Sequence, residues 1–335
     1  MEADSIPPPK KRGEMLIKNS EIAIDNMNPF QNDCLDRKQN IIDLTNLLRT
    51  ANQPFVLSIE APWGWGKTTF IKMWKSFLET EKHPSLYFNA WNNDFADDPL
   101  IAFISEVKNL IVDIKDGEKL KSVNRALRNT QKIGGAILKK SIPVVLKVAT
   151  QGIVDDQVLA YFKNGGDEIG EIVEQFAEDR IKAYEQNKNS IVEFKKSLEK
   201  LVTEIRKDEN EKRPIIFFID ELDRCRPDFA LTLLERIKHL FSVDGIVFVL
   251  SIDRNQLASS LQPVYGNGID ADGYLRRFID LRFNLPSPST EQFCKLLFSK
   301  FNIDTFFQER RIAIPNRIDT NENANFEEAF TNLMN

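Results

Sequence analysis

Histidine and cysteine are scarce in this chain of 335 residues. It has only two histidines, His83 and His239, and three widely separated cysteines, Cys34, Cys225 and Cys294. So few histidines argue against a zinc site or a histidine-based catalytic triad. No two cysteines have metal-ligand spacing, and their odd number argues against a disulfide framework. We therefore expect a protein of the reducing cytoplasm, where disulfides are rare.

Strong net charge and long uncharged apolar runs are also missing. The net charge of −5 gives no overall attraction to nucleic acid or anionic lipid. The most apolar stretch, residues 133–148, contains three lysines and a proline. A membrane-spanning helix needs about 20 largely uncharged residues. We therefore expect no transmembrane helix here, and interpret the stretch as a soluble helix or, alternatively, as an amphipathic segment at a membrane interface.

Five short apolar runs predict the strands of an α/β domain with a mostly parallel sheet. They lie at residues 55–59, 86–89, 215–219, 246–250 and 281–284. The third and fourth runs are apolar on both faces, which is typical of central strands covered by helices on both sides. Helical patterns at about 67–79 and 229–241 supply two of the covering helices.

The connection between the second and third predicted strands is unusually long. It spans roughly 120 residues, whereas a parallel crossover needs about a dozen. We therefore expect a helical insertion, with a second long helix at about 189–206. The predicted division is an extended or disordered segment at 1–27, core at 28–91, insertion at 92–213, core at 214–288, and a C-terminal helical segment with a polar tail at 289–335.

The insertion contains a run of basic residues without an acid. Its eight members are Lys119, Lys121, Arg125, Arg128, Lys132, Lys139, Lys140 and Lys147. An acidic helical stretch follows at 167–179. The basic run is interpreted as a solvated helix face or as a contact surface for nucleic acid or a membrane.

A glycine-rich segment between the first predicted strand and the next helix has the composition of a phosphate-binding loop. Its last three positions match the Walker A pattern G-x-x-x-x-G-K-[ST], while Ala61 replaces the first glycine. Small residues let backbone N–H groups converge on phosphate oxygens. Lys67 would contact the β and γ phosphates, and Thr68 would offer its hydroxyl to Mg²⁺. The predicted ATP-binding residues are Pro62, Trp63, Gly64, Trp65, Gly66, Lys67, Thr68 and Thr69.

The third predicted strand runs directly into acidic residues. An apolar strand that ends in Asp-Glu is the Walker B arrangement, so Asp220 would hold Mg²⁺ through water. Glu221 would orient and polarise the attacking water. Asp223 is a rival for either role, and the alternative for all three is a solvated turn. After the fourth strand, Ser251 and Asp253 are candidates to bind the water or the γ-phosphate, or to cap a helix.

These segments together resemble the KAP family of P-loop NTPases, in the additional-strand class of STAND/AAA-like proteins. The resemblance rests on the loop at 61–69, on 88–91, on 218–227, on 251–257 and on 274–279 before 283–286. It implies a sheet order of 5-1-4-3-2, ATP hydrolysis and a long insertion after the second strand. Bacterial members are associated with phage or plasmid exclusion, which implies a role in anti-phage defence or signalling.

An arginine from a neighbouring subunit often completes such a site. The candidates are Arg224, Arg236, Arg276 and Arg277. Arg277 is preferred because it matches a basic position of the family, and Arg224 is next. An arginine that acts in trans implies a homo-oligomer, or a complex with an effector protein.

The leading hypothesis is an ATPase that converts ATP to ADP and phosphate with Mg²⁺ and couples this to assembly or partner binding. Two alternatives stay open. One is a nucleotide-gated scaffold that hydrolyses ATP slowly. The other is a nucleic-acid-linked ATPase, which the basic run would serve.

Overall fold

A five-stranded parallel sheet forms the centre of the computed structural model, which describes residues 24–96, 98–107, 117–141, 169–206, 213–266 and 268–301. The strands are β1 (Phe55–Glu60), β2 (Ser85–Asn89), β3 (Ile215–Asp220), β4 (Ile246–Ile252) and β5 (Leu281–Asn284). Their order is β2-β3-β4-β1-β5, and every pair is parallel. This is the predicted order, read from the opposite edge, so the fold prediction is confirmed.

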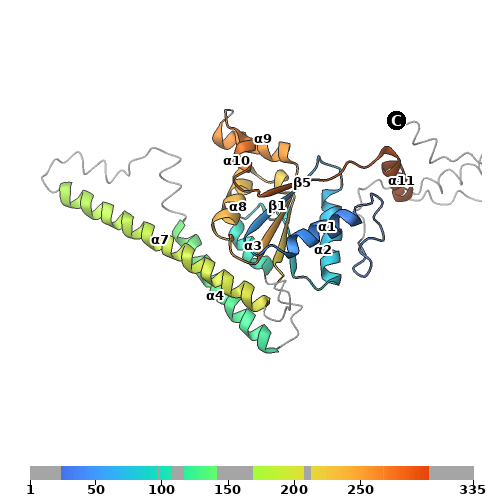
Figure 1. Ribbon diagram of the computed structural model, residues 1–335. Coiled ribbons are helices and arrows are strands. Elements are labelled where there is room, and N and C mark those ends of the chain that lie inside the picture. The colour runs from blue at the N-terminus through green and yellow to red at the C-terminus, as the bar shows by residue number, and fades with distance from the viewer. Residues whose placement is uncertain are drawn as a thin grey trace, which may run out of the picture.

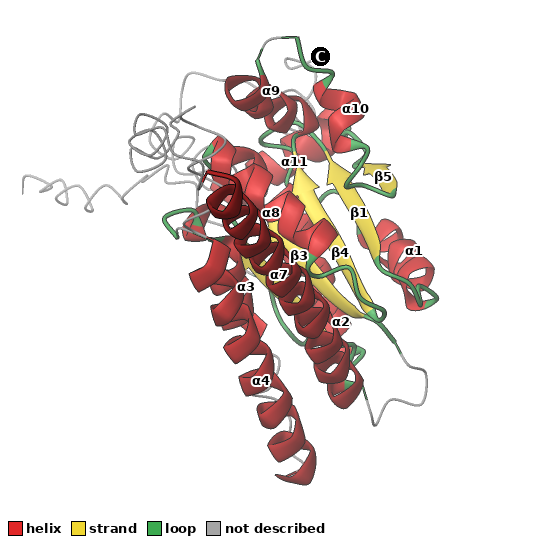
Figure 2. Ribbon diagram, turned by 90° about the vertical axis from the view of Figure 1, so that its left-hand side faces the viewer, coloured by secondary structure: helices red, strands yellow, loops and turns green. Residues whose placement is uncertain are grey.

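Helices cover both faces of this sheet, because the central strands are apolar on both sides. Every residue of β3 and β4 is buried. Alternate residues of a strand point to opposite faces, and Phe218 accordingly packs with α1 (Lys38–Arg49) and α2 (Lys67–Thr80). Its neighbour Phe217 packs with α3 (Pro99–Val107) and α8 (Pro227–His239) on the other face. Figure 2 shows the resulting three layers.

The carboxyl ends of the strands continue into short elements that carry polar side chains. β2 is followed by the 3₁₀ turn η1 (Trp91–Asn93), and β3 by the 3₁₀ turn η3 (Leu222–Arg224). β4 leads into α9 (Arg254–Tyr265) and α10 (Ala271–Leu275), and β5 leads into α11 (Thr290–Phe301). Because all strands are parallel, these ends gather along one edge of the sheet.

Two helices of the predicted insertion form an antiparallel hairpin. It consists of α4 (Gly117–Ser141) and α7 (Ile169–Ile205), and Figure 1 shows the pair projecting away from the sheet. Ser122 of α4 donates to Glu204, while Asn129 donates to Ser197, which fixes the antiparallel direction. The predicted helix at 189–206 was too short: α7 is one helix of 37 residues. No proline or glycine interrupts it after its first turn, so nothing ends it earlier.

Two adjacent glycines of α4 offer a test of how this hairpin packs. A Cβ at Gly134 would lie 2.8 Å from Ile104 Cδ1 and 3.2 Å from Phe194 Cε2, whereas a Cβ at Gly135 would meet nothing within 4 Å. Both changes to alanine favour the helix by about 1 kcal/mol. We expect Gly134→Ala to be about 1–2 kcal/mol less stable than Gly135→Ala because of overpacking. Urea unfolding followed by circular dichroism measures the difference, and equal stabilities would contradict this packing.

Several predictions concern residues outside the described ranges. These are most of the N-terminal segment, Lys147, the start of the acidic stretch, and the tail beyond residue 301. The division of the chain into segments also stays a prediction. Within the described ranges, no helix combines the length and the apolarity needed to cross a bilayer.

Candidate nucleotide-binding site

The loop between β1 and α2 has the backbone that a phosphate-binding loop requires. Gly64 and Gly66 have φ angles of 85° and 78°, in the left-handed region that favours glycine, and Gly66 caps the start of α2. Ala61 is not among the described non-glycine residues with positive φ. Alanine is therefore tolerated where the motif has its first glycine.

Lys67 lies inside this loop. Its side chain is 8% exposed, and its Nζ donates to the carbonyl oxygens of Ala61 at 2.7 Å and of Pro62 at 3.3 Å. Burial lowers the pKa of Lys67, and the negative charges of Asp223, Asp253 and Asp220 oppose that shift. The lysine from one motif thus lies in the field of the acids at the ends of β3 and β4.

Asp220, the last residue of β3, is buried, and its carboxylate accepts three hydrogen bonds. Its Oδ1 accepts from Ser251 Oγ at 2.6 Å and from the Glu221 amide at 3.0 Å, and its Oδ2 accepts from Tyr87 Oη at 3.0 Å. Burial, reinforced by the charge of Asp220, raises the pKa of Tyr87, so the phenol remains a donor. The carboxylate is therefore held in one orientation from both neighbouring strands. Ser251 can reach Asp220 because the register of β3 and β4 places these two residues side by side.

Glu221 projects its carboxylate from a strained backbone. Its φ of 59° lies in the left-handed region, which costs a non-glycine residue about 1–2 kcal/mol. Asn89 Nδ2 donates to its Oε2 at 2.9 Å, and Arg224 donates to its Oε1 at 2.6 Å. Strained residues cluster at functional sites. The strain at Glu221, together with a hydrogen bond to each of its carboxylate oxygens, therefore makes it a candidate functional residue.

Asp223 connects the two motifs. Its Oδ2 accepts from Trp63 Nε1 of the loop at 2.6 Å and from the Asp253 amide at 3.0 Å. Asp253 in turn caps α9, because its Oδ1 accepts from the amides of Asn255 and Gln256. For Asp253 the structure thus shows the helix-cap alternative. Asp223 lies where it can hold the phosphate loop against the end of β3.

The four candidate arginines lie in different places. Arg224 pairs with Glu221 and lies over the ring of Trp91, with 5.6 Å to the ring centroid. Arg236 pairs with Asp98, and Arg276 pairs with Asp272. Arg277 is exposed and lies over Tyr274, 5.7 Å from its centroid. Among the contacts of the described residues, Arg224 is the one of the four that reaches a predicted catalytic residue.

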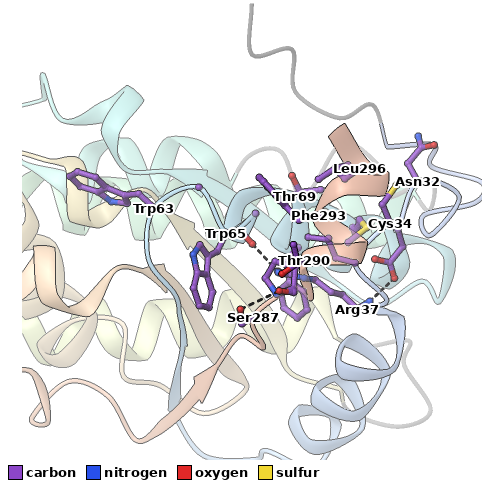
Figure 3. A pocket seen from close by; sticks show the side chains of 17 residues that line it. Asn32, Cys34, Arg37, Trp63, Trp65, Thr69, Ser287, Thr290, Phe293 and Leu296 are labelled. Atoms are coloured by element: carbon purple, nitrogen blue, oxygen red, sulfur yellow. Dashed lines mark hydrogen bonds between the residues drawn. The ribbon is translucent and has the colours of Figure 1, made fainter. Parts of the chain in front are cut away.

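A cavity of about 570 Å³ lies beside the loop, and sequence reasoning missed it. Three separate segments meet there: residues 32–37 before α1, the loop with the first turns of α2, and residues 287–296 after β5. Figure 3 shows Arg37 approaching Trp65 from one side, with Ser287, Thr290 and Phe293 nearby. The volume is typical of a small-molecule site.

Arg37 is the basic residue among those that line this cavity, and Asp33 is the acidic one. Its side chain is 3% exposed, and its Nη2 donates to the carbonyl oxygen of Trp65 at 2.9 Å. Burial lowers the pKa of Arg37 to about 10, opposed by the charge of Asp33. Its Nη1 and Asp33 Oδ1 are both buried without a hydrogen-bond partner among the described residues. A donor and an acceptor are thus available to a ligand.

Tyr87 and Asn89 were also missed as site residues. Both lie on β2, and the register places Asn89 beside Asp220. The available signal was the parallel order itself, since the end of β2 must lie next to the end of β3.

Comparison with known proteins gives one family match, to the KAP family P-loop domain over residues 37–334. Aeropyrum pernix ORC2, solved with ADPNP and ADP, is 14% identical with a TM-score of 0.37, over 79% of this chain and 51% of that one. Its ADP form is 13% identical with a TM-score of 0.35, over 86% of this chain and 56% of that one. C. elegans PCH-2 is 14% identical with a TM-score of 0.32, over 89% of this chain and 57% of that one. The chain thus spans little more than half of these solved chains. No curated protein matches.

Proposed function

The chain belongs to the KAP family of P-loop domains, and from this membership and the geometry of the site we propose that it hydrolyses ATP to ADP and phosphate with Mg²⁺. The observation that carries the proposal is the contact between the two motifs. Trp63 of the loop donates a hydrogen bond to Asp223, three residues after the end of β3, at 2.6 Å. The charges of Asp223, Asp253 and Asp220 oppose the lowering of the pKa of Lys67 by burial. The phosphate loop and the acidic strand end are therefore parts of one site.

The side chains present fit a magnesium ion. Mg²⁺ is usually held by one or two carboxylates together with substrate phosphates and waters. Asp220 offers one oriented carboxylate, and Thr68, in the first turn of α2, offers a hydroxyl. Within the described ranges, no group of three or more His, Cys, Asp or Glu side chains could hold a metal ion. The mode of binding described here, through one carboxylate, a hydroxyl and the phosphates, does not need such a group. A bound ion would neutralise the charge that develops on the phosphates.

The protein's own groups would divide the remaining work. Loop amides and the start of α2 would bind the phosphate oxygens. Lys67 would exchange its bonds to Ala61 and Pro62 for bonds to the β and γ phosphates. Glu221 would orient the attacking water and accept its proton, once its carboxylate leaves Asn89 or Arg224.

We place the nucleoside in the cavity beside Arg37. An Arg37→Met variant keeps an unbranched apolar stem but removes the guanidinium and its donors, including the hydrogen bond to the carbonyl oxygen of Trp65. A hydrogen bond from a charged group contributes about 1.5–3 kcal/mol, so we expect ADP to bind about 10- to 100-fold more weakly. Calorimetric titration with ADP measures this.

Arg49 supplies the matched control, since it lies at the other end of α1 and pairs with Glu81 at the surface. Arg49→Met should change ADP affinity by less than about threefold. Equal losses in the two variants would show that the effect comes from α1 in general, and would remove the nucleoside from this cavity.

One observation favours a second candidate, a nucleotide-gated scaffold that hydrolyses ATP slowly. The Glu221 carboxylate is occupied by Asn89 and Arg224, and its release would then limit turnover. Phosphate release measured with Mg²⁺ over a range of protein concentrations separates the two. Fast turnover favours the ATPase, whereas one slow turnover with tight binding favours the scaffold.

The same concentration series tests completion of the site by a second chain. We extend the proposal to an oligomer, or a complex with an effector, in which exposed Arg277 acts in trans. A rate per chain that rises with concentration supports this, and a constant rate opposes it. On the family resemblance alone, we assign such assemblies to cytoplasmic defence or signalling.

A further inference from the structure

Four basic residues form one straight stripe along α4. Lys121, Arg125, Arg128 and Lys132 are all exposed and follow one another at intervals of four, three and four residues. This spacing keeps them on one side of a helix with 3.6 residues per turn, over a length of about 16 Å. The side chains that pack against α7 and the core, among them Val123, Leu127 and Thr130, lie on the opposite side. The stripe therefore points away from the rest of the hairpin.

No ion pair within the described ranges neutralises this stripe. None of its four members occurs in a salt bridge between described residues. The single acid of α4, Glu118, lies in the first turn. Like charges at helical spacing destabilise a helix by about 0.2–0.5 kcal/mol per pair.

The partner helix shows that charges of one sign are not a general property of the hairpin. The exposed residues of α7 alternate in sign, with Glu193, Lys196, Glu199 and Lys200 in succession. Such mixing is the ordinary solution for a solvated helix, because opposite charges at these spacings attract. The stripe on α4 lacks this mixing, because all four of its residues are basic.

The chemistry of the stripe fits a linear polyanion. A helix that lies on a membrane inserts large apolar side chains beside its basic residues. The large exposed apolar residues in the described ranges include none from α4. Contact would therefore depend on charge alone. Duplex nucleic acid carries about one negative charge per 1.7 Å of its axis, so several phosphates lie within the length of the stripe.

We propose that the outer face of α4 binds the phosphate backbone of duplex nucleic acid, without reading its sequence. This inference is independent of ATP hydrolysis, because the stripe belongs to the hairpin and not to the nucleotide site.

Fluorescence anisotropy of the full chain with a labelled DNA duplex of about 20 base pairs, without nucleotide, tests the proposal. Four phosphate contacts predict that log K falls with log salt concentration with a slope of about −3 to −4. The variant Arg125→Gln/Arg128→Gln/Lys132→Gln should reduce the slope to about −1 and the affinity at about 50 mM salt at least 100-fold. Because these residues are exposed, the fold should survive, which circular dichroism checks.

The matched control removes three exposed lysines from α7 of the same hairpin, as Lys188→Gln/Lys196→Gln/Lys200→Gln. Retained binding in this control, with loss in the α4 variant, supports the proposal. Equal losses in both variants overturn it, since charge anywhere would then suffice. Absence of binding at low salt also overturns it. So does binding of vesicles rich in phosphatidylserine without binding of the duplex, because that result assigns the stripe to a membrane.

Discussion

A Lys67→Ala variant is expected to show no measurable ATP binding at concentrations that saturate the unsubstituted chain. Lys67 is the cation inside the loop, and its ammonium already bonds to Ala61 and Pro62. Alanine would leave the loop without a charge to meet the β and γ phosphates. Two or more charge-assisted hydrogen bonds at about 1.5–3 kcal/mol each correspond to a loss of at least about 100-fold. Calorimetric titration measures the affinity.

The control for this variant is Lys75→Ala, on the same helix and paired with Glu79 at the surface. It should bind ATP with unchanged affinity. Thermal unfolding gives a second readout, since a ligand that binds only the folded state raises stability by about 2.7 kcal/mol at 100 times its Kd. ADP should stabilise the unsubstituted chain and the control but not Lys67→Ala. Unchanged affinity in Lys67→Ala would sink the assignment of the loop.

The sheet and its order could be predicted from the sequence because their signals are local. Residues 215–219 and 246–250 are continuous apolar runs, and both became fully buried strands. The glycines and Lys67 are likewise consecutive, so one short segment determines the loop. The left-handed φ angles observed at Gly64 and Gly66 are ones that glycine adopts without steric cost.

The missed parts of the site depend on contacts between distant segments. Asn89 reaches Glu221 across 132 positions, and Trp63 reaches Asp223 across 160. The cavity at Arg37 needs three segments that meet only in the folded chain. Side-chain polarity alone gives no hint of these partners. The strand order limits the possibilities for Asn89, but it leaves Arg37 without any signal.

The structure also sharpened the role of individual acids. Four acids were predicted at the strand ends, and their hydrogen bonds now distinguish them. Asp220 accepts hydrogen bonds from three donors, Asp223 accepts one from Trp63, and Asp253 caps α9. Glu221 differs, because its partners are two side chains that can rotate away while its backbone carries the strain. We therefore propose Glu221, among these four acids, as the one that acts on water.

A Glu221→Gln variant should therefore bind ATP normally but hydrolyse it about 100- to 10,000-fold more slowly, the usual contribution of a general base. The amide keeps the size of the side chain and can still accept from Asn89, but it cannot take a proton from water. Loss of the pair with Arg224, whose side chain is 40% exposed, should cost at most about 1 kcal/mol of stability. Single-turnover phosphate release and calorimetry measure the rate and the affinity separately.

Glu79→Gln, on the exposed side of α2, is the matched control and should hydrolyse ATP at the unsubstituted rate. The pattern of outcomes separates the two proposed functions. If Glu221 is the base of an ATPase, rate falls and affinity stays. If release of Glu221 from Asn89 and Arg224 limits a slow switch, Asn89→Ala should instead accelerate hydrolysis, because it removes one of the two bonds that hold the carboxylate. A full rate in Glu221→Gln would contradict both and would transfer the role to Asp223.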